Sequence, residues 1–273
     1  MTGETACASE PSVVLITGAS RRIGRVIALD FAARGWRVGL HYRHSAAEAE
    51  ALVEEIEAFG TRAVAVAADL ADHAQAATLV PSVARALGTV TCLINNASEF
   101  QFDSVTAMTE ASWNTHLDVN LKAPVFLAQA LAAALPQGIG GHVINIIDQR
   151  VWNLTPEFFS YTVSKAGLWS ATRMLAQALA PRVRVNAIGP GPVLQSVHQT
   201  PEEFADECAA TLLQRGTTPR EIADAVRFIL DAPAMTGQML ALDGGQHLAW
   251  QADRGPAAST ASTAPGTQAT TSR

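Results

Sequence analysis

The chain has 273 residues, a net charge of −6 at pH 7 and a hydrophobic fraction of 48%, which predicts a folded globular protein with a large buried core. This charge balance gives no reason to expect nucleic acid as a partner. Its three cysteines lack metal-binding spacing, no apolar run is long enough to cross a bilayer, and no secretory signal is recognisable. We therefore expect a cytoplasmic protein without metal or membrane association.

Short apolar runs alternate with longer amphipathic patterns along the chain. The runs predict strands at residues 12–17, 37–42, 62–67, 90–95, 142–147, 183–188 and 238–242. The patterns predict helices at residues 23–34, 46–59, 74–87, 111–134 and 160–179. Continuous apolar strands that each precede a helix are typical of a parallel sheet covered on both faces. The sequence thus predicts an α/β class protein, a single-domain, doubly wound Rossmann fold with seven parallel strands and helices on both faces.

The two ends of the chain differ from the rest in composition. Residues 1–11 are small and polar and predict a flexible leader. Residues 251–273 are rich in Ala, Ser, Thr, Gly and Pro and predict a disordered tail, because such a segment buries too little apolar surface to offset its ordering entropy. The folded domain is expected to span residues 12–250.

The first predicted strand leads into residues 17–24 (TGASRRIG). Gly18 permits a tight turn, Gly24 lets the next helix approach the sheet, and free N–H groups at the helix start suit a pyrophosphate. Arg22 replaces the middle glycine of the usual pattern, so it either pairs with phosphate oxygens or is a solvated surface residue. We predict that the cofactor is bound here by Gly18, Arg21, Arg22 and Ile23.

The end of the second predicted strand indicates which nicotinamide cofactor is bound. An acidic residue there would accept hydrogen bonds from the adenine ribose and repel a 2′-phosphate. This chain has no carboxylate between residue 37, where that strand begins, and Glu48. Together with Arg21, the residues at this position predict a cationic pocket, and hence NADPH: His41, Tyr42, Arg43 and Ser45.

Polar residues also follow the third and fourth predicted strands. Asp69 and Leu70 are expected to contact the adenine, and Asn96 and Ala97 to lie along the cofactor. A helix N-cap is an equally open interpretation of Asp69 or of Asp72.

Tyr161 and Lys165 are four residues apart on a predicted helix and therefore share one face. A nearby ammonium group lowers the pKa of a phenol, so the pair is expected to deliver a proton while a hydride arrives from nicotinamide. A tyrosine and a lysine at this spacing often occur by chance. Here the pair follows the fifth strand of a dinucleotide-binding pattern, in a chain with only two tyrosines.

These features together resemble the short-chain dehydrogenase/reductase family over roughly residues 12–248. The resemblance rests on the glycine turn, the Tyr161-x-x-x-Lys165 pair, Asn120 and the segments 95–97 (NNA), 190–191 (PG) and 243–245 (DGG). It implies a nicotinamide cofactor and a dimer or tetramer, and we expect a homotetramer. It also implies that Asn120 holds a water behind Lys165, that Lys165 binds the nicotinamide ribose, and that Pro190 and Gly191 lie near the nicotinamide.

The family normally has a serine thirteen residues before its tyrosine, where this chain has Asp148. A serine hydroxyl donates a hydrogen bond to a substrate carbonyl, whereas an ionised carboxylate only accepts. Asp148 therefore favours a substrate with N–H donors, or is itself held protonated next to Tyr161. Reduction of a ring C=N bond fits both cases. The structural alternative is that Asp148 caps a loop or helix.

The same replacement occurs in pteridine and dihydromonapterin-type reductases, which the chain also resembles in Arg22 and in segments 41–49 (HYRHSAAEA) and 96–100 (NASEF). In that subgroup the aromatic residue matching Phe100 stacks the pterin on the nicotinamide, with the residues matching Arg22 and Ser98 nearby. Without the resemblance, Phe100 is an ordinary core residue. The expected substrate-binding residues are Arg22, Ser98, Phe100, Asp148 and Tyr161.

We predict NADPH-dependent reduction of a dihydropterin or dihydrofolate, with a small-molecule substrate. The alternative is a short-chain carbonyl reductase that acts on a 3-oxoacyl thioester or another ketone. A minor alternative is a non-catalytic nucleotide-binding regulator. The polar segment 194–216 predicts a mobile lid with one helix, in which His198 and Cys208 are not expected to be catalytic. Trp152, Phe158 and Phe159 either line the pocket or pack in the core.

Overall fold

The computed structural model describes residues 12–249, so the predicted leader at 1–11 and tail at 251–273 lie outside the described residues. In the described part, one sheet has the strand order β3-β2-β1-β4-β5-β6-β7, and every neighbouring pair is parallel. The strands are β1 (Val13–Ile16), β2 (Arg37–Tyr42), β3 (Ala63–Ala67), β4 (Val90–Asn95), β5 (Gly141–Ile146), β6 (Val183–Pro190) and β7 (Met239–Leu242). The predicted α/β class and the seven parallel strands are confirmed.

Helices connect the strands much as the sequence predicts. They are α1 (Arg22–Ala33), α2 (Ala46–Glu57), α3 (His73–Ala76), α4 (Leu79–Leu87), α5 (Glu110–Leu117), α6 (Ala123–Ala134), α7 (Phe159–Leu179), α8 (Pro201–Ala209) and α9 (Pro219–Asp231). The helix expected at 74–87 is divided into α3 and α4. The helix expected at 111–134 contains a π-helical segment, η1 (Asp118–Lys122), between α5 and α6. An additional helix, α9, starts at a capping box formed by Thr218 and Glu221.

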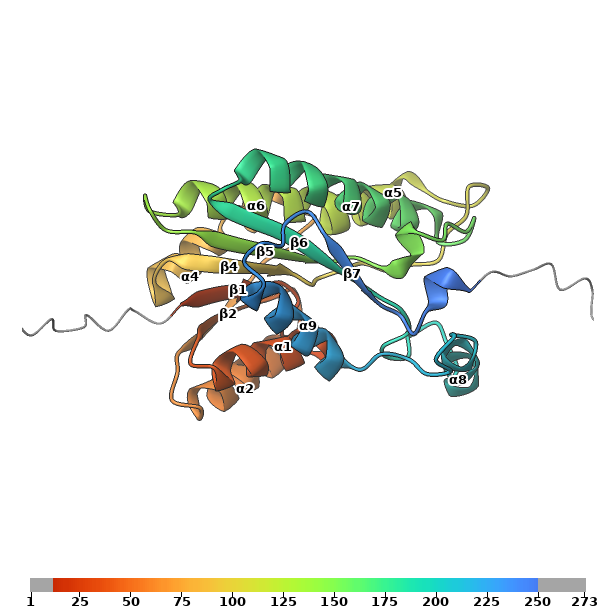
Figure 1. Cartoon of the computed structure of the whole chain (residues 1–273), viewed down its shortest axis with the longest axis horizontal. Coiled ribbons are helices and arrows are strands. Elements are labelled where there is room, and N and C mark those ends of the chain that lie inside the picture. Colours follow the sequence, from red (N-terminus) through yellow and green to blue (C-terminus); the bar gives the residue numbers. More distant parts are fainter. Residues whose placement is uncertain (1–11, 250–273) are drawn as a thin grey trace, which may run out of the picture.

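The sheet is covered on both faces, which explains why its strands are apolar throughout. In β1, Val13 and Leu15 belong to the core on one face, while Val14 and Ile16 belong to the core on the other. Helices α4, α6 and α7 cover the first face and α1, α2 and α9 cover the second, whereas α8 stands apart from both layers (Figure 1). None of the helices in residues 12–249 has the length and apolar character needed to cross a bilayer.

The strand order reverses direction at β1, which pairs with β2 on one side and β4 on the other. In a parallel sheet this reversal opens a crevice beyond the carboxyl ends of the strands, where ligands bind. The segments that follow β1, β2, β4 and β5 carry most of the predicted site residues, so the topology brings them to one edge of the sheet.

Candidate active site

A cavity of about 700 Å³ lies at the carboxyl ends of the strands. It is lined by every site residue that the sequence predicts except Asn120, which is fully buried and hydrogen-bonded to Ser98 and Glu99 of the lining. The prediction that these residues form one site therefore agrees with the fold. Among residues 12–249, no cluster of three or more His, Cys, Asp or Glu side chains is placed to hold a metal ion.

The turn after β1 has the geometry that its glycines predict. Gly18 has φ +62°, in the left-handed region that favours glycine. A Cβ atom at Gly24 would collide with the Gly18 carbonyl oxygen and lie 2.7 Å from Asn96 Nδ2. The Asn96 amide donates to the carbonyls of Thr17 and Gly18 at 2.9 and 3.0 Å, so it holds the turn in place from β4. The close packing at Gly24 forms a backbone cradle of the kind that accepts a pyrophosphate.

His41 connects the turn to two strand ends. Its Nδ1 accepts a hydrogen bond from Gly18 N at 3.1 Å, and its Nε2 lies 3.1 Å from the Ala68 carbonyl. Because Nδ1 is an acceptor, the ring proton resides on Nε2. Burial lowers the pKa of His41, which keeps the ring neutral. His41 lines the predicted cofactor cavity, but both of its polar atoms are used within the protein.

The region where a 2′-phosphate is expected contains cations, two hydroxyls and one unexpected carboxylate. Arg21 is exposed at the start of α1, and Ser20 Oγ lies 2.5 Å from Ser45 Oγ. Arg43 is paired with Glu99 at 2.6 Å. Glu99 comes from the loop after β4, so an inspection of the segment after β2 could not find it.

Asp69 and Asp72 have separate roles after β3. Asp69 Oδ1 accepts from the Ala71 N–H at 2.9 Å, which closes a local turn next to the cavity. Asp72 is the N-cap of α3 and accepts from Ala74 N and Gln75 N. The helix-cap interpretation is therefore correct for Asp72 and wrong for Asp69.

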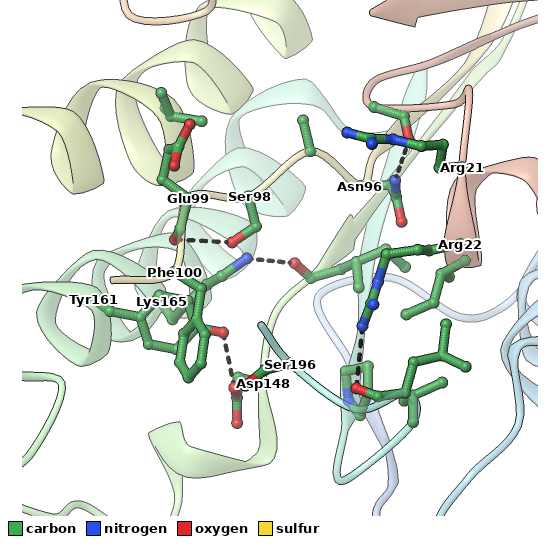
Figure 2. Close-up of a pocket in the computed structure, with 18 of the residues that line it drawn as sticks. Arg21, Arg22, Asn96, Ser98, Glu99, Phe100, Asp148, Tyr161, Lys165 and Ser196 are labelled. Atoms are coloured by element: carbon green, nitrogen blue, oxygen red, sulfur yellow. Dashed lines mark hydrogen bonds between the residues drawn. The ribbon is translucent and has the colours of Figure 1, made fainter. Parts of the chain in front are cut away.

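Arg22 joins the glycine turn to the predicted lid. Its guanidinium donates to the Leu194 and Gln195 carbonyls, each at 3.0 Å; Figure 2 draws a hydrogen bond from Arg22 on this side of the cavity. Its φ is +53°, so the replacement of glycine by arginine leaves the backbone in a conformation that glycine adopts more easily. The side chain is exposed, and its guanidinium is hydrogen-bonded to main-chain carbonyls rather than left free in solvent.

Asp148 is hydrogen-bonded to Tyr161. The Tyr161 hydroxyl donates to Asp148 Oδ2 at 2.8 Å (Figure 2), and the second oxygen, Oδ1, accepts from the Arg150 N–H at 2.8 Å. Asp148 is thus both the cap of a short 3₁₀ turn, η2 (Gln149–Val151), and the partner of the tyrosine. Burial raises the pKa of Asp148, whereas both hydrogen bonds oppose that shift.

Lys165 is 2% exposed, and its Nζ donates to the Ile146 carbonyl at 2.9 Å. Burial lowers the pKa of Lys165 to about 8. Burial, and next to it the charge of Asp148, raise the pKa of Tyr161 well above its usual value. The expectation that Lys165 makes Tyr161 easier to ionise is therefore wrong for this chain, because the carboxyl group is hydrogen-bonded to the phenol while the ammonium is 5.8 Å from the ring centroid.

Asn120 lies in the π-helical segment, and its side chain is fully occupied. Its Oδ1 accepts from Ser98 Oγ and Glu99 N, and its Nδ2 donates to the Glu99 carbonyl and to Ser164 Oγ. The carboxamide has no free position for the expected water.

Phe100 packs within an aromatic group at the cavity wall. Its ring is stacked on Phe158 with centroids 4.5 Å apart and meets Tyr161 edge-on at 4.7 Å. Phe158 lines the cavity, while Trp152 and Phe159 do not. His198 from the lid also lines the cavity, and its Nε2 lies 3.3 Å from the Phe100 carbonyl.

A family model described as enoyl-(acyl carrier protein) reductase matches residues 18–247, which is most of the chain. The chain belongs to the short-chain dehydrogenase/reductase family. The resemblance stated from its motifs is confirmed, and with it the prediction of an oxidoreductase.

Solved structures refine this placement within the short-chain dehydrogenase/reductases. Alternative dihydrofolate reductase 1 (FolM) from Brucella suis, in complex with NADP, is 48% identical, has a TM-score of 0.86 and covers 90% of this chain and 98% of its own. The Brucella canis protein of the same name is also 48% identical, with a TM-score of 0.84 and coverage of 89% and 96%. The predicted pteridine reductase-like subgroup is therefore confirmed. These structures contain NADP, the cofactor that the sequence predicts.

Other relatives of this short-chain dehydrogenase/reductase carry different names. The 3-oxoacyl-[acyl-carrier-protein] reductase FabG of Staphylococcus epidermidis is 31% identical over 239 residues, which cover 86% of this chain and 98% of the relative. An uncharacterized oxidoreductase of Methylorubrum extorquens is 35% identical over 244 residues, with coverage of 86% and 98%.

Proposed function

We propose that the chain catalyses the NADPH-dependent reduction of a ring C=N bond in a dihydropterin or dihydrofolate. The observation that carries the proposal is the hydrogen bond between Tyr161 and Asp148 inside the cavity. The identity of 48% to two alternative dihydrofolate reductases supports the same substrate class.

The residues around the turn after β1 fit NADPH. The cradle at Gly18 and Gly24 suits the pyrophosphate, and Arg21 with the Ser20–Ser45 hydroxyl pair suits the 2′-phosphate. Lys165, in its buried position near Tyr161, fits the nicotinamide ribose. When bound, NADPH supplies the hydride that is added to the carbon of the C=N bond.

Tyr161 and Asp148 manage the proton that the ring nitrogen receives. A carboxyl group whose pKa is raised by burial can be kept protonated and can donate a hydrogen bond, which an ionised carboxylate cannot do. In its ionised form it accepts from the N–H groups of a pterin. Both forms suit a nitrogen heterocycle, and the ionised form opposes the alkoxide that develops when a ketone is reduced.

The pterin ring is proposed to bind against Phe100, with Ser98 and Arg22 nearby. Phe100 and Tyr161 are already in edge contact, so a ring placed against Phe100 in the cavity lies next to the proton donor. Because Arg22 is held by the lid carbonyls, its contact with substrate depends on the position of the lid.

Reduction of a 3-oxoacyl thioester is the second candidate, because FabG relatives are 31% identical over most of their length. Asp148 argues against it, since the hydroxyl that donates to a ketone oxygen is replaced by a carboxyl group. The comparison of the two substrate classes is therefore the decisive measurement.

The test follows NADPH oxidation by the purified protein with dihydrobiopterin, dihydromonapterin, dihydrofolate and a short 3-oxoacyl thioester, with NADH in parallel. We expect turnover of at least one pterin and a preference for NADPH. Turnover of the thioester without any pterin would exclude the proposal, and a preference for NADH would exclude the cofactor. Light scattering of the same sample tests the proposed homotetramer.

A further inference from the structure

Two buried hydrogen-bonded rungs connect α5 and the π-helical segment to the catalytic helix α7. His116 Nδ1 lies 2.6 Å from Ser160 Oγ, and Asn120 Nδ2 donates to Ser164 Oγ at 3.1 Å. All four residues are 0% exposed. The two members on each side are four residues apart, so the rungs are one helical turn apart. The two serines immediately precede the tyrosine and lysine of the active site.

The far ends of the same two rungs hold the loop that carries Phe100. Gln101 N donates to His116 Nε2 at 3.1 Å, and Glu99 N donates to Asn120 Oδ1 at 2.8 Å. The backbone is thus anchored on both sides of Phe100. Residues 96–103 form no helix or strand, so these side chains provide hydrogen bonds that regular structure would otherwise supply.

The hydrogen bonds allow only one arrangement of protons at His116. Because Nε2 accepts from the backbone of Gln101, the ring proton is on Nδ1 and is donated to Ser160 Oγ. The Ser160 hydroxyl in turn donates to Asp103, whose other oxygen accepts from Ser160 N at 3.1 Å. Burial lowers the pKa of His116, and the charge of Asp103 opposes this shift. A neutral ring with both nitrogens engaged has one orientation, so it fixes the loop to α7.

We infer that His116 is a positioning residue, which sets the place of Phe100 relative to Tyr161 and thereby the place of the substrate ring. The contact that it controls is the edge-on packing of the two rings at 4.7 Å. The part of the inference that concerns the substrate rests on the proposed function. The part that concerns the loop does not.

The test compares two substitutions of the same residue. His116→Leu removes both hydrogen bonds. His116→Gln keeps an acceptor that can reach Gln101 N. A buried control at the opposite side of the sheet, Ile56→Ala, lowers stability without touching the loop, because Ile56 is fully buried in α2. If His116→Leu does not fold, Ser160→Ala removes the same rung from its other end.

Steady-state kinetics give the first readout. We expect His116→Leu to raise KM for the dihydropterin about tenfold. The substitution leaves the partly buried N–H of Gln101 without an acceptor and releases the loop, and the free-energy cost of such a loss corresponds to roughly a factor of ten in an equilibrium constant. KM for NADPH should stay within about twofold, since the two direct partners of His116, Gln101 and Ser160, are not among the proposed cofactor residues. His116→Gln should recover most of the loss, and Ile56→Ala should change neither constant. Equal increases in both KM values, or no rescue by glutamine, would overturn the inference.

Hydrogen exchange gives a readout that needs no substrate. The amides of Glu99 and Gln101 should exchange faster in His116→Leu than in the wild type, and should be protected again in His116→Gln. Unchanged exchange at residues 99–101 in His116→Leu would show that the rung does not hold the loop. If the wild type reduces no pterin, the proposed function fails, while this experiment still decides the role of His116.

Discussion

The hydroxyl of Tyr161 donates to Asp148 Oδ2 at 2.8 Å, and burial raises the pKa of both groups. The phenol is thus kept protonated by a carboxyl neighbour rather than made acidic by Lys165. In a short-chain dehydrogenase/reductase this relationship replaces the hydroxyl that would donate to a ketone. The hydrogen-bond partner of the Tyr161 hydroxyl is therefore the carboxyl group of Asp148 and not the ammonium of Lys165.

The first prediction concerns Asp148. Replacing it with serine removes the carboxyl group and restores a hydroxyl, so kcat/KM for a dihydropterin should fall by about 100-fold, as expected for a lost acid–base group. Activity on a 3-oxoacyl thioester should rise relative to the pterin. Both values are measured with saturating NADPH.

Asp231→Asn is a suitable control for this change, because Asp231 ends α9 at the surface and its ion pair with Arg34 is long, at 3.6 Å. It should leave both activities unchanged. Undiminished pterin reduction by the Asp148→Ser protein would show that the carboxyl group takes no part in the reaction.

The sequence was sufficient to predict the sheet and most of the cavity lining. Strand and helix periodicities identify the elements, and parallel topology places the ends of β1, β2, β4 and β5 together. The roles of Gly18 and Gly24 could be predicted from the sequence because each depends mainly on the backbone of the turn in which the glycine lies. Tyr161 and Lys165 could be paired because four residues span one helical turn.

The contacts that the sequence did not reveal all join segments far apart in the chain. Arg43 pairs with Glu99, and Arg22 binds carbonyls at 194 and 195, which depend on how two irregular loops meet. The rung from His116 to Ser160 could have been suspected from polar residues at helical spacing on two predicted helices. The pKa of Tyr161 could not, because it depends on which neighbour the hydroxyl contacts.

The second prediction concerns the choice of cofactor. Arg21→Ala should raise KM for NADPH about ten- to hundredfold, because a charge-assisted hydrogen bond to the 2′-phosphate is lost. Arg43→Ala should have a smaller effect, since Arg43 is already paired with Glu99. Glu99→Gln should lower KM for NADPH a few-fold, because it frees Arg43. KM for NADH, measured in parallel, should not change in any of the three, and a parallel loss for both cofactors would contradict the assignment.

The third prediction concerns the glycine cradle. Gly24→Ala places a Cβ atom against the Gly18 carbonyl and Asn96, so the turn must move. We expect a loss of about 1–3 kcal/mol in the free energy of unfolding, as for other overpacked sites, and weaker NADPH binding. Gly140→Ala is the matched control, because its Cβ would make only an ordinary contact at 3.5 Å. Urea unfolding and cofactor titration measure the two effects, and equal behaviour of the two variants would contradict the close packing.

The last prediction concerns Lys165, whose pKa is lowered to about 8 from 10.5 by burial. Between these two values the unfolded state binds more protons than the folded state, so the free energy of unfolding should rise with pH from about 8 to 10.5. Below pH 8 the cost of burying the ammonium is fully present. Lys165→Met removes this cost and should stabilise the protein at pH 7 by about 1–2 kcal/mol, after the loss of the hydrogen bond to Ile146 is counted. The substitution should also abolish the rise in the free energy of unfolding between pH 8 and 10.5. Reductase activity should fall at least about 100-fold.

Lys122→Met, at the chain's other lysine, is the matched control. Lys122 is half-exposed and pairs with Asp118 on its own helical segment, where such pairs contribute only about 0.3–0.5 kcal/mol. Other groups that titrate at alkaline pH are the same in all three proteins, so their contributions cancel when urea midpoints are compared at pH 7, 8.5 and 10. If the difference between wild type and Lys165→Met is the same at all three values, the ammonium is not held at a lowered pKa. Lys165 would then be charged throughout catalysis, and a fall of kcat/KM above pH 8 would have to come from Tyr161 and Asp148.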